Sequence, residues 1–517
     1  MKKTCRNVFA MTLVLLAVLS GCSGTQNSEI SVGSEMGVYA RQKVTIGINN
    51  EPVMLDPAYA MDSFGSLVIL NIHDPLVRRG ADGKVYPNLA KSWEISTDGL
   101  VYTFVLEEGV KFQNGQELTA EDVVFSLNRS IANPASALYT TPFDHAEVID
   151  DYTVKLINKF PDQATLQYLT GGNNCIVSKA IVENVGEDEY NNFPCGTGPY
   201  KLVEWQKGSS LIFERFDEYW RGAPSIKDVE LRILKEATTM MVALESGDID
   251  QAYNIQAIDV PTVKASAKLN YRETFGTSIW NIVYNCNLEP FNDVKVRNAL
   301  SMAINKQDIV DGAADGAGKV GNIILTPETE GNPGEDRINY LKYDPQTAKA
   351  LLAEAGFPNG FKTVIYVRED FTKKIGSIIQ SQWKEIGVEA EVVVMERSAL
   401  LADSKAGKLT CYTTGNVSIT MDASFLLGTL ASYNIPASNY TFWSDPEYDA
   451  LLDQQSRESD PIKRLELITQ MLNYEAMVTP RATLYYTTAN TAFNKKLNAD
   501  VYPALEGYYW YNLSWSE

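Results

Sequence analysis

Histidine is nearly absent from this chain of 517 residues, which carries only His73 and His145. These two lie far apart in the sequence, and zinc sites commonly rely on imidazole ligands, so we expect no metal and no other cofactor. Positive charge is also in deficit, since 45 Lys and Arg stand against 65 Asp and Glu and the pI is about 4.7. A nucleic-acid-binding protein presents a basic face, and a formal net charge of −20 argues against that class.

The usual hydrolase signatures are missing as well. The sequence holds neither GxSxG nor HExxH, and no Cys/His pair lies near a predicted strand end. Acidic neighbours such as Asp248 and Asp250 are expected by chance in a chain so rich in carboxylates. We therefore predict a protein that is not an enzyme and has no catalytic residues.

The N-terminus has the composition of an export signal. The basic start Met1–Arg6 precedes the apolar run 8–19, which is too short to span a bilayer and has the length of a signal-peptide core. The next residues, Leu19–Cys22, read Leu-Ser-Gly-Cys and resemble the bacterial lipoprotein box. That resemblance implies removal of 1–21, a lipid on Cys22 and attachment to the extracytoplasmic side of a membrane. An ordinary cleaved signal with a chance cysteine is the alternative.

Four cysteines remain beyond this signal: Cys175, Cys195, Cys286 and Cys411. None of them forms a CxxC motif or has the spacing of metal ligands, and an exported protein can form disulfides. Three pairings are possible, and the sequence does not choose among them. Thiols without a disulfide are the alternative.

Apolar residues make up 45% and charged residues 21% of the chain, which is typical of a globular protein, and the length allows two to four domains. Alternating apolar residues predict a first strand over 43–48. A loop with Pro52 and Pro57 follows, and then a helix over 64–72.

Near the middle of the chain the spacing of apolar residues changes from that of a strand to that of a helix. This change indicates that the chain passes from one lobe of the protein into another. Residues 279–284 are predicted to form a strand, and Pro290 stiffens the connection that follows. Helical spacing then runs over 294–304, with Asn292 or Asp293 as the N-cap. Because ligand sites favour the junction between domains, we expect the cleft here.

Strands and helices alternate through the rest of the chain. A hairpin is predicted from 93–95 and 102–106, and Thr119 caps the next helix in a capping box with Asp122. The stretch Gly316–Gly321 matches GxGxxG by letters but lacks the flanking strand and helix, so we predict a loop. The other expected elements are strands over 200–205, 362–367, 389–395 and 479–488 and helices over 238–246, 345–355, 375–386 and 464–474.

Several of these stretches resemble one protein family. "KFQNGQELTAEDVVFS" (111–126), "GTGPY" (196–200), "LESGDIDQA" (244–252) and "PFNDVKVRNALSMAINKQDIV" (290–310) are similar to segments of the peptide/nickel-type extracellular solute-binding proteins, family 5, which serve ABC importers. The resemblance implies an α/β, periplasmic-binding-protein-like fold, in which two large lobes surround a hinge and cleft and a small accessory α+β lobe is added.

The same resemblance implies a division of the chain into segments. The signal peptide is followed by a flexible tether, three pieces of lobe I, the accessory lobe II and lobe III. The expected ranges are 1–21 for the signal, 22–42 for the tether, 43–78, 196–286 and 480–517 for lobe I, 79–195 for lobe II and 287–479 for lobe III.

Two loops are implied to line the cleft. One is the loop after the first strand, with Glu51, Pro52 and Val53. The other is the stretch 409–427, in which oligopeptide binders carry an Asp for the ligand's ammonium group. Here no acid precedes Asp422, so a peptide held by its free N-terminus in the usual way is not expected. The candidates from this stretch are Tyr412, Gly415, Asn416, Val417, Ser418, Ile419 and Asp422.

Aromatic residues supply the other cleft candidates. Trp280, Tyr284, Tyr485 and Tyr486 flank the two predicted crossings. Aromatics are also dense over 501–515, where we favour packing onto the first lobe over a stacking surface for ligand.

The resemblance implies a monomeric receptor that closes on a small solute, most often a peptide, and delivers it to the permease and ATPase subunits of an importer. An oligosaccharide or another small molecule is an alternative ligand. A receptor for a peptide signal is an alternative role.

Overall fold

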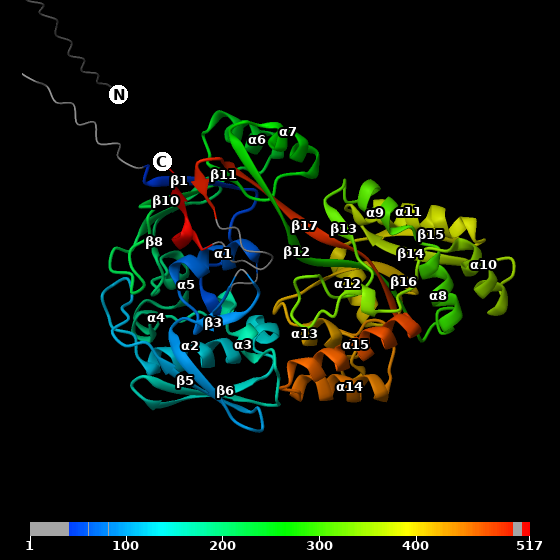
Figure 1. Cartoon of the computed structure of the whole chain (residues 1–517), viewed down its shortest axis with the longest axis horizontal. Helices are drawn as coiled ribbons and strands as arrows, with labels where there is room; N and C mark the ends of the chain where they lie inside the picture. The colour runs from blue at the N-terminus through cyan, green and yellow to red at the C-terminus, as the bar shows by residue number, and fades with distance from the viewer. Residues whose placement is uncertain (1–40, 60–61, 81, 500–508, 517) are drawn as a thin grey trace, which may run out of the picture. The chain divides into compact units, whose positions relative to one another are not determined.

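The computed structural model describes residues 41–59, 62–80, 82–499 and 509–516, and residues from Arg41 onward form one compact unit (Figure 1). The expected signal peptide, Cys22 and most of the tether lie outside the described residues. The unit is built on an 11-stranded mixed sheet. In sheet order its strands are β15 (Glu389–Met395), β14 (Lys362–Arg368), β16 (Cys411–Val417), β12 (Leu269–Tyr284), β17 (Arg481–Asn494), β11 (Gln251–Ala252), β1 (Lys43–Ile48), β10 (Asp228–Ile233), β9 (Ser210–Arg215) and β8 (Tyr200–Gln206), with β13 (Gly318–Val320) on β17.

Two long strands tie the halves of this sheet together. β12 and β17 pair antiparallel from Leu269 opposite Asn494 to Val283 opposite Arg481. One end of β17 enters a core with β1 and β8–β10, and the other end enters a core with β14 and β16. The fold therefore has two large lobes joined by two crossing strands, which lie between the two lobes in Figure 1.

We call the half that contains β1 and β8–β11 the N-terminal lobe. Its core holds Ile46, Leu67, Phe213 and Trp510. Its helices are α1 (Ser63–Ile72), α6 (Ala237–Ser246) and α7 (Val260–Ala265). Because α1 is buried from Gly65 to Ile72, it anchors the loop that follows β1.

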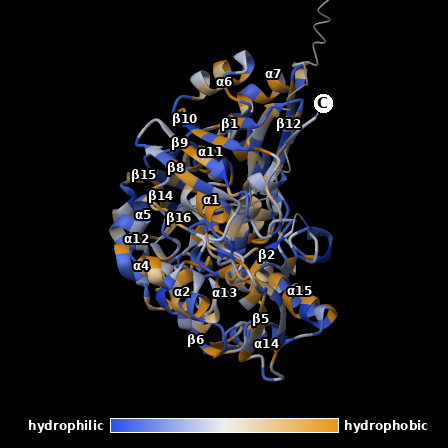
Figure 2. Ribbon diagram, turned by 90° about the vertical axis from the view of Figure 1, so that its left-hand side faces the viewer, coloured by the Kyte–Doolittle hydropathy of each residue, from blue (hydrophilic) through white to orange (hydrophobic). Residues whose placement is uncertain are grey.

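The other half, with β13–β16, is called the far lobe. Its main core contains Ile282, Leu300, Ile365 and Trp383, and a second cluster lies around Tyr448. Its helices are α8 (Val294–Met302), α9 (Lys306–Gly312), α10 (Pro345–Glu354), α11 (Thr372–Glu385), α12 (Arg397–Lys405), α13 (Ala423–Gly428), α14 (Pro446–Arg457) and α15 (Pro461–Val478). Figure 2 shows hydrophobic and hydrophilic residues side by side on α14 and α15, as expected for helices with one buried face.

A third part, the accessory lobe, has its own sheet and core. Its antiparallel sheet has the order β4 (Ala90–Ile95), β5 (Val101–Leu106), β7 (Thr153–Asn158) and β6 (Phe143–Asp150). Its other elements are β2 (Val77–Arg79), β3 (Val85–Pro87), α2 (Ala120–Ala132), α3 (Thr165–Tyr168), α4 (Lys179–Val185) and α5 (Glu187–Asn192). The predicted capping box is confirmed, since the Thr119 backbone N–H donates to the Asp122 carboxylate at 3.1 Å.

Several local predictions are confirmed and two are wrong. β1, α1, α10 with its Asp344 cap, and β15 lie where they were predicted. The stretch Gly316–Gly321 is not simply a loop, because β13 within it pairs with β17. The helix that begins at Val294 ends at Met302, two residues before the predicted end.

The cysteines and the C-terminus settle two further alternatives. No disulfide joins the four cysteines from Cys175 to Cys411, all of which lie in the described part of the chain, so the thiol alternative holds. Trp510 packs against Tyr200 and Phe213 with ring centroids 5.7 and 4.8 Å apart, which confirms that this residue packs onto the first lobe. Among the described residues, no helix has both the length and the apolar character that crossing a membrane requires.

Candidate functional site

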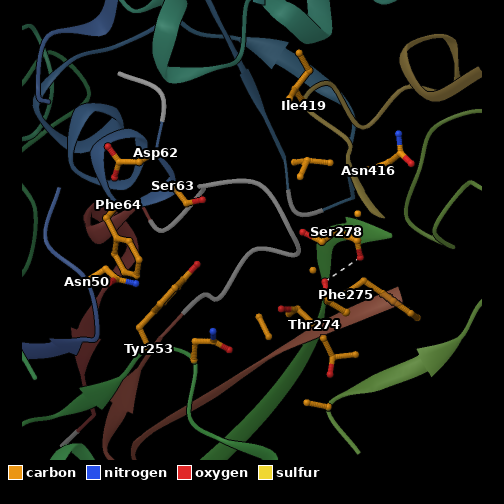
Figure 3. Close-up of a pocket in the computed structure, with 18 of the residues that line it drawn as sticks. Asn50, Asp62, Ser63, Phe64, Tyr253, Thr274, Phe275, Ser278, Asn416 and Ile419 are labelled. Atoms are coloured by element: carbon orange, nitrogen blue, oxygen red, sulfur yellow. Dashed lines mark hydrogen bonds between the residues drawn. The ribbon is translucent and has the colours of Figure 1, made fainter. Parts of the chain in front are cut away.

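A cavity of about 1980 Å³ lies along the crossing strands, and residues of all three lobes line it. β12 and β17 contribute Thr274–Gly276, Ser278, Tyr485 and Thr487–Asn490. Protein sites for small ligands usually measure about 300–1,000 Å³, so this cavity has room for a ligand larger than a single amino acid. Figure 3 shows Phe64 and Tyr253 together on one side of this space and Asn416 on the other.

The loop after β1 forms part of the wall on the N-terminal lobe. Glu51 and Val53 line the cavity, and Val53 is exposed. The Glu51 carboxylate accepts hydrogen bonds from Trp205 Nε1 at 2.8 Å and from the Gly208 backbone at 3.0 Å. These hydrogen bonds from Trp205 and Gly208 fix the loop after β1 and leave the Glu51 carboxylate already paired. Pro52 is buried and does not line the cavity.

The start of α1 continues this wall. Asp62 is the N-cap, with its carboxylate accepting from the Gly65 backbone at 2.8 Å and from the Val53 backbone at 3.2 Å. Phe64 packs edge-on against Tyr253, with ring centroids 5.7 Å apart. The wall is therefore a rigid aromatic surface beside a carboxylate that is occupied by backbone donors (Figure 3).

The opposite wall comes from β16 and the residues after it. Gly415, Asn416, Val417 and Ile419 line the cavity, and Val417 is 46% exposed. The Asn416 side-chain oxygen accepts from Asn281 Nδ2 at 3.0 Å, which fixes the orientation of its amide. This part of the wall carries no charge.

Comparison with known proteins fits this architecture. Residues 84–437 match the family described as "Bacterial extracellular solute-binding proteins, family 5 Middle". The chain belongs to family 5 of the bacterial extracellular solute-binding proteins. Its relatives include heme-binding protein A of Haemophilus influenzae (30% identical, 89% of each chain) and the dipeptide-binding protein of Escherichia coli (28% identical, 83% of this chain and 86% of that one). The solved structure of HbpA2 from Haemophilus parasuis superposes with a TM-score of 0.85 at 28% identity, covering 92% of this chain and all of that one. Members of this family are the solute-binding proteins of ABC importers, and they act as binding proteins on the extracytoplasmic side.

Four predicted cleft residues of this family 5 protein lie inside the core. Tyr284 is 0% exposed and its hydroxyl is 3.0 Å from Ser301 Oγ. Tyr412 is buried in a small apolar cluster, and the Tyr486 hydroxyl donates to the Ile323 carbonyl at 2.9 Å. Asp422 is 1% exposed and accepts from Arg464 Nη2 at 2.7 Å. Contrary to expectation, none of these four residues lines the cavity. Burial raises the pKa of the three phenols, and Arg464 pairs with the Asp422 carboxylate.

Two other candidates lie just behind the wall. Trp280 does not line the cavity, but it supports residues that do: a Cβ on Gly415 would lie 3.2 Å from its ring, and Phe371 packs edge-on against it at 4.7 Å. Ser418 is 1% exposed, and among the described residues its hydroxyl has no hydrogen-bond partner. Tyr485 lines the cavity.

Sequence reasoning missed several lining residues. Tyr253 and Asn254 follow the two-residue strand β11, and Asn254 has a positive φ of 58°. Phe371 precedes α11, and Tyr509 belongs to the C-terminal aromatics, for which packing was favoured over a stacking surface. All four lie in connections outside the regular helices and strands, where periodicity carries no signal.

The charged groups of the cavity are few and mostly occupied. The lining carboxylates are Glu51, Asp62, Asp311 and Asp315, and the lining cations are Arg79, Arg397 and Lys405. Asp315 lies 3.3 Å from Lys374, and Arg79 donates to the Thr420 carbonyl at 2.7 Å. No cluster of three or more His, Cys, Asp or Glu suited to a metal ion occurs in the described residues.

Proposed function

We propose that this family 5 protein is a lipid-anchored receptor that captures short peptides and hands them to the permease of an ABC importer. The observation that carries the proposal is the cavity of about 1980 Å³ along the crossing strands. A closed two-lobe receptor needs its ligand at such a junction, because contacts to both lobes favour the closed state.

The edge of β16 supports a peptide as the ligand. β12 pairs with β16 from Ser278 to Tyr284, whereas among the described residues β14 pairs with it only at Cys411 and Tyr412. The edge of Gly415–Val417 on the β14 side therefore offers backbone donors and acceptors at the cavity. An extended peptide can bind there as an added strand. Among the relatives are a dipeptide-binding protein and a structure of DppA from Helicobacter pylori with the peptide STSA.

The neutral wall restricts how that peptide is held. Gly415–Ile419 carry no carboxylate, and the lining acids already have other partners. Glu51 and Asp62 accept from Trp205 and from the Gly65 backbone, Asp311 accepts from Gln307 Nε2 at 2.9 Å, and Asp315 lies 3.3 Å from Lys374. Burying a ligand ammonium group without a partner is costly, so the cavity favours peptides whose amino terminus is blocked or stays in solvent. An oligosaccharide or another uncharged solute is the second candidate, favoured by the same neutral wall.

On this proposal the hinge for closure lies in the middle of the crossing strands. The β12–β17 register shifts between Phe275 and Ile279 and again between Trp280 and Asn281. Such irregularities bend a strand locally, which suits a hinge. On this proposal the ranges 43–78, 196–286 and 480–517 move as one lobe and 287–479 as the other, with 79–195 as the accessory lobe.

Membrane attachment and partners complete the proposal. Residues 1–21 act as the signal, Cys22 receives the lipid, and 22–42 form the tether of a monomeric receptor. The permease and ATPase subunits are the partners, and no catalytic residue is assigned. Replacing Cys22 with Ser should abolish incorporation of labelled palmitate and release the protein from the membrane fraction.

Ligand class is tested by thermal shift with tri-alanine and N-acetyl-tri-alanine. Both should raise the melting temperature, and the acetylated peptide should bind at least as well. Val417→Arg, at the exposed cavity wall, should abolish both shifts. Val203→Arg is the matched control, because Val203 on β8 is 52% exposed, close to the 46% of Val417, but does not line the cavity. A response to maltotriose but to neither peptide would contradict the peptide assignment.

A further inference from the structure

The accessory lobe and the far lobe touch on the side of the cavity away from the crossing strands. Arg79 Nη2 donates to the Thr420 carbonyl at 2.7 Å. Gln167 Nε2 donates to Glu330 Oε2 at 2.6 Å, and the Gln163 backbone N–H donates to the Ser456 carbonyl at 3.2 Å. In Figure 1, α3 of the accessory lobe and α13 of the far lobe face each other below β12 and β17.

Gln167 is the centre of this contact. It is 3% exposed, and its side-chain oxygen accepts from Arg79 Nε at 2.9 Å while its amide donates to Glu330. Glu330 is exposed and its bond to Gln167 is only partly buried, but a hydrogen bond to a charged group is stronger than one between neutral groups. The Arg79–Gln167 pair thus makes two directional bonds to the far lobe.

The far side of the contact is built into the cavity wall. The Glu330 backbone N–H donates to the Met421 carbonyl at 2.7 Å, and the Ala423 N–H donates to the Glu330 carbonyl at 3.0 Å. Ile419 lines the cavity and also packs against the apolar core of the accessory lobe. The segment from Ile419 to Ala423 therefore links the ligand wall directly to Gln167.

We propose that Arg79 and Gln167 form a clasp that positions the ligand-binding wall by holding Ile419–Ala423 against the accessory lobe when the protein is closed. The inference rests on hinge closure in the proposed function. Rotation about β12 and β17 moves the lobes apart at the side where the clasp lies, so the two hydrogen bonds must break before ligand can leave. The clasp residues are positioning residues, and the accessory lobe supplies them.

The test is hydrogen–deuterium exchange, read by mass spectrometry on the full chain as purified in detergent. Gln167→Glu keeps the size and the acceptor for Arg79 but places a carboxylate against Glu330. Exchange at the backbone amides of Glu330 and Ala423 in the far lobe should become about tenfold faster, as expected for loss of one charge-assisted hydrogen bond. Gln116→Glu is the control, because Gln116 accepts from Ser178 within the accessory lobe.

A second variant separates the clasp from simple loss of folding. Adding Glu330→Gln to Gln167→Glu restores a donor opposite an acceptor. Slow exchange at the far-lobe amides of residues 330 and 423 should then return. Faster exchange confined to 163–171, with the far-lobe amides unchanged, would overturn the clasp, and so would failure of the double variant to rescue. Neither result bears on ligand class, which the peptide titrations test separately.

Discussion

Asp162 lies at the contact between the accessory and far lobes and has an unusual protonation equilibrium. It is 7% exposed, and its Oδ1 accepts from the Ala164 backbone at 2.8 Å. Burial raises the pKa of this carboxyl from an ordinary 3.8 to about 6. Asp422 of the far lobe adds to the rise and Arg464 opposes it, while the phenols of Tyr168 and Tyr433 also sense its charge.

The direction of the pH effect follows from this shift. The folded protein binds the Asp162 proton more tightly than the unfolded chain, so its stability is fully present below about pH 3.8 and falls as pH rises through about 6. Each unit of difference between the folded and the unfolded pKa corresponds to about 1.4 kcal/mol. The ionised Asp162 carboxylate therefore lowers the free energy of unfolding by about 3 kcal/mol at neutral pH. Asp162→Asn removes this cost, because the amide is neutral at every pH and still accepts from Ala164.

The assay is urea unfolding followed by tryptophan fluorescence from pH 4 to pH 8. Asp162→Asn should match the wild type near pH 4 and exceed it by about 3 kcal/mol at pH 7.5. Asp151→Asn is the control, since Asp151 is an exposed carboxylate in the same lobe. Parallel pH curves for wild type and Asp162→Asn would refute the reasoning.

Three shorter predictions concern packing, a buried ion pair and specificity. Gly360→Ala should destabilise the fold severely, because φ is +76° and a Cβ would overlap a backbone carbonyl of the loop before β15; Gly109→Ala, at a φ of +72° in open space, should cost only about 1 kcal/mol in the same urea assay. Arg464→Met should lower the free energy of unfolding in urea by about 3–5 kcal/mol, because Asp422 is left buried without its cation. Adding Asp422→Asn should recover part of this loss, and no recovery would contradict the ion-pair argument. Asn416→Asp places a carboxylate on the cavity wall, so calorimetric affinity for tri-alanine relative to its acetylated form should rise about tenfold; an unchanged ratio would exclude this position from amine recognition.

Elements with a local signal could be predicted from the sequence. Asp344 is the N-cap of α10, Pro345 is its first residue, and Gly356 at a φ of +91° follows its end. The start and the end of this helix can therefore be predicted from residues next to it in the chain. β15 has the predicted bounds Glu389–Met395 because apolar residues recur along the strand. Such patterns depend only on neighbours in the chain.

The position of side chains relative to the cavity could not be predicted in the same way. Tyr284 and Tyr485 both lie on crossing strands, yet only Tyr485 lines the cavity, because the pairing of β12 with β17 and β16 decides which part of each strand lies in the core. β13 has three residues and pairs with β17 more than 160 residues away. The Gln167–Glu330 bond joins residues 163 positions apart. Periodicity does not reveal such long-range partners.

The central claim is that the cavity holds a peptide. Its most direct test is mass spectrometry of small molecules released when the purified full chain is denatured, since a receptor with a large cavity between its lobes can retain its ligand through purification. We predict short peptides, among them species with a blocked amino terminus. A single non-peptide compound released in proportion to the protein would contradict the claim.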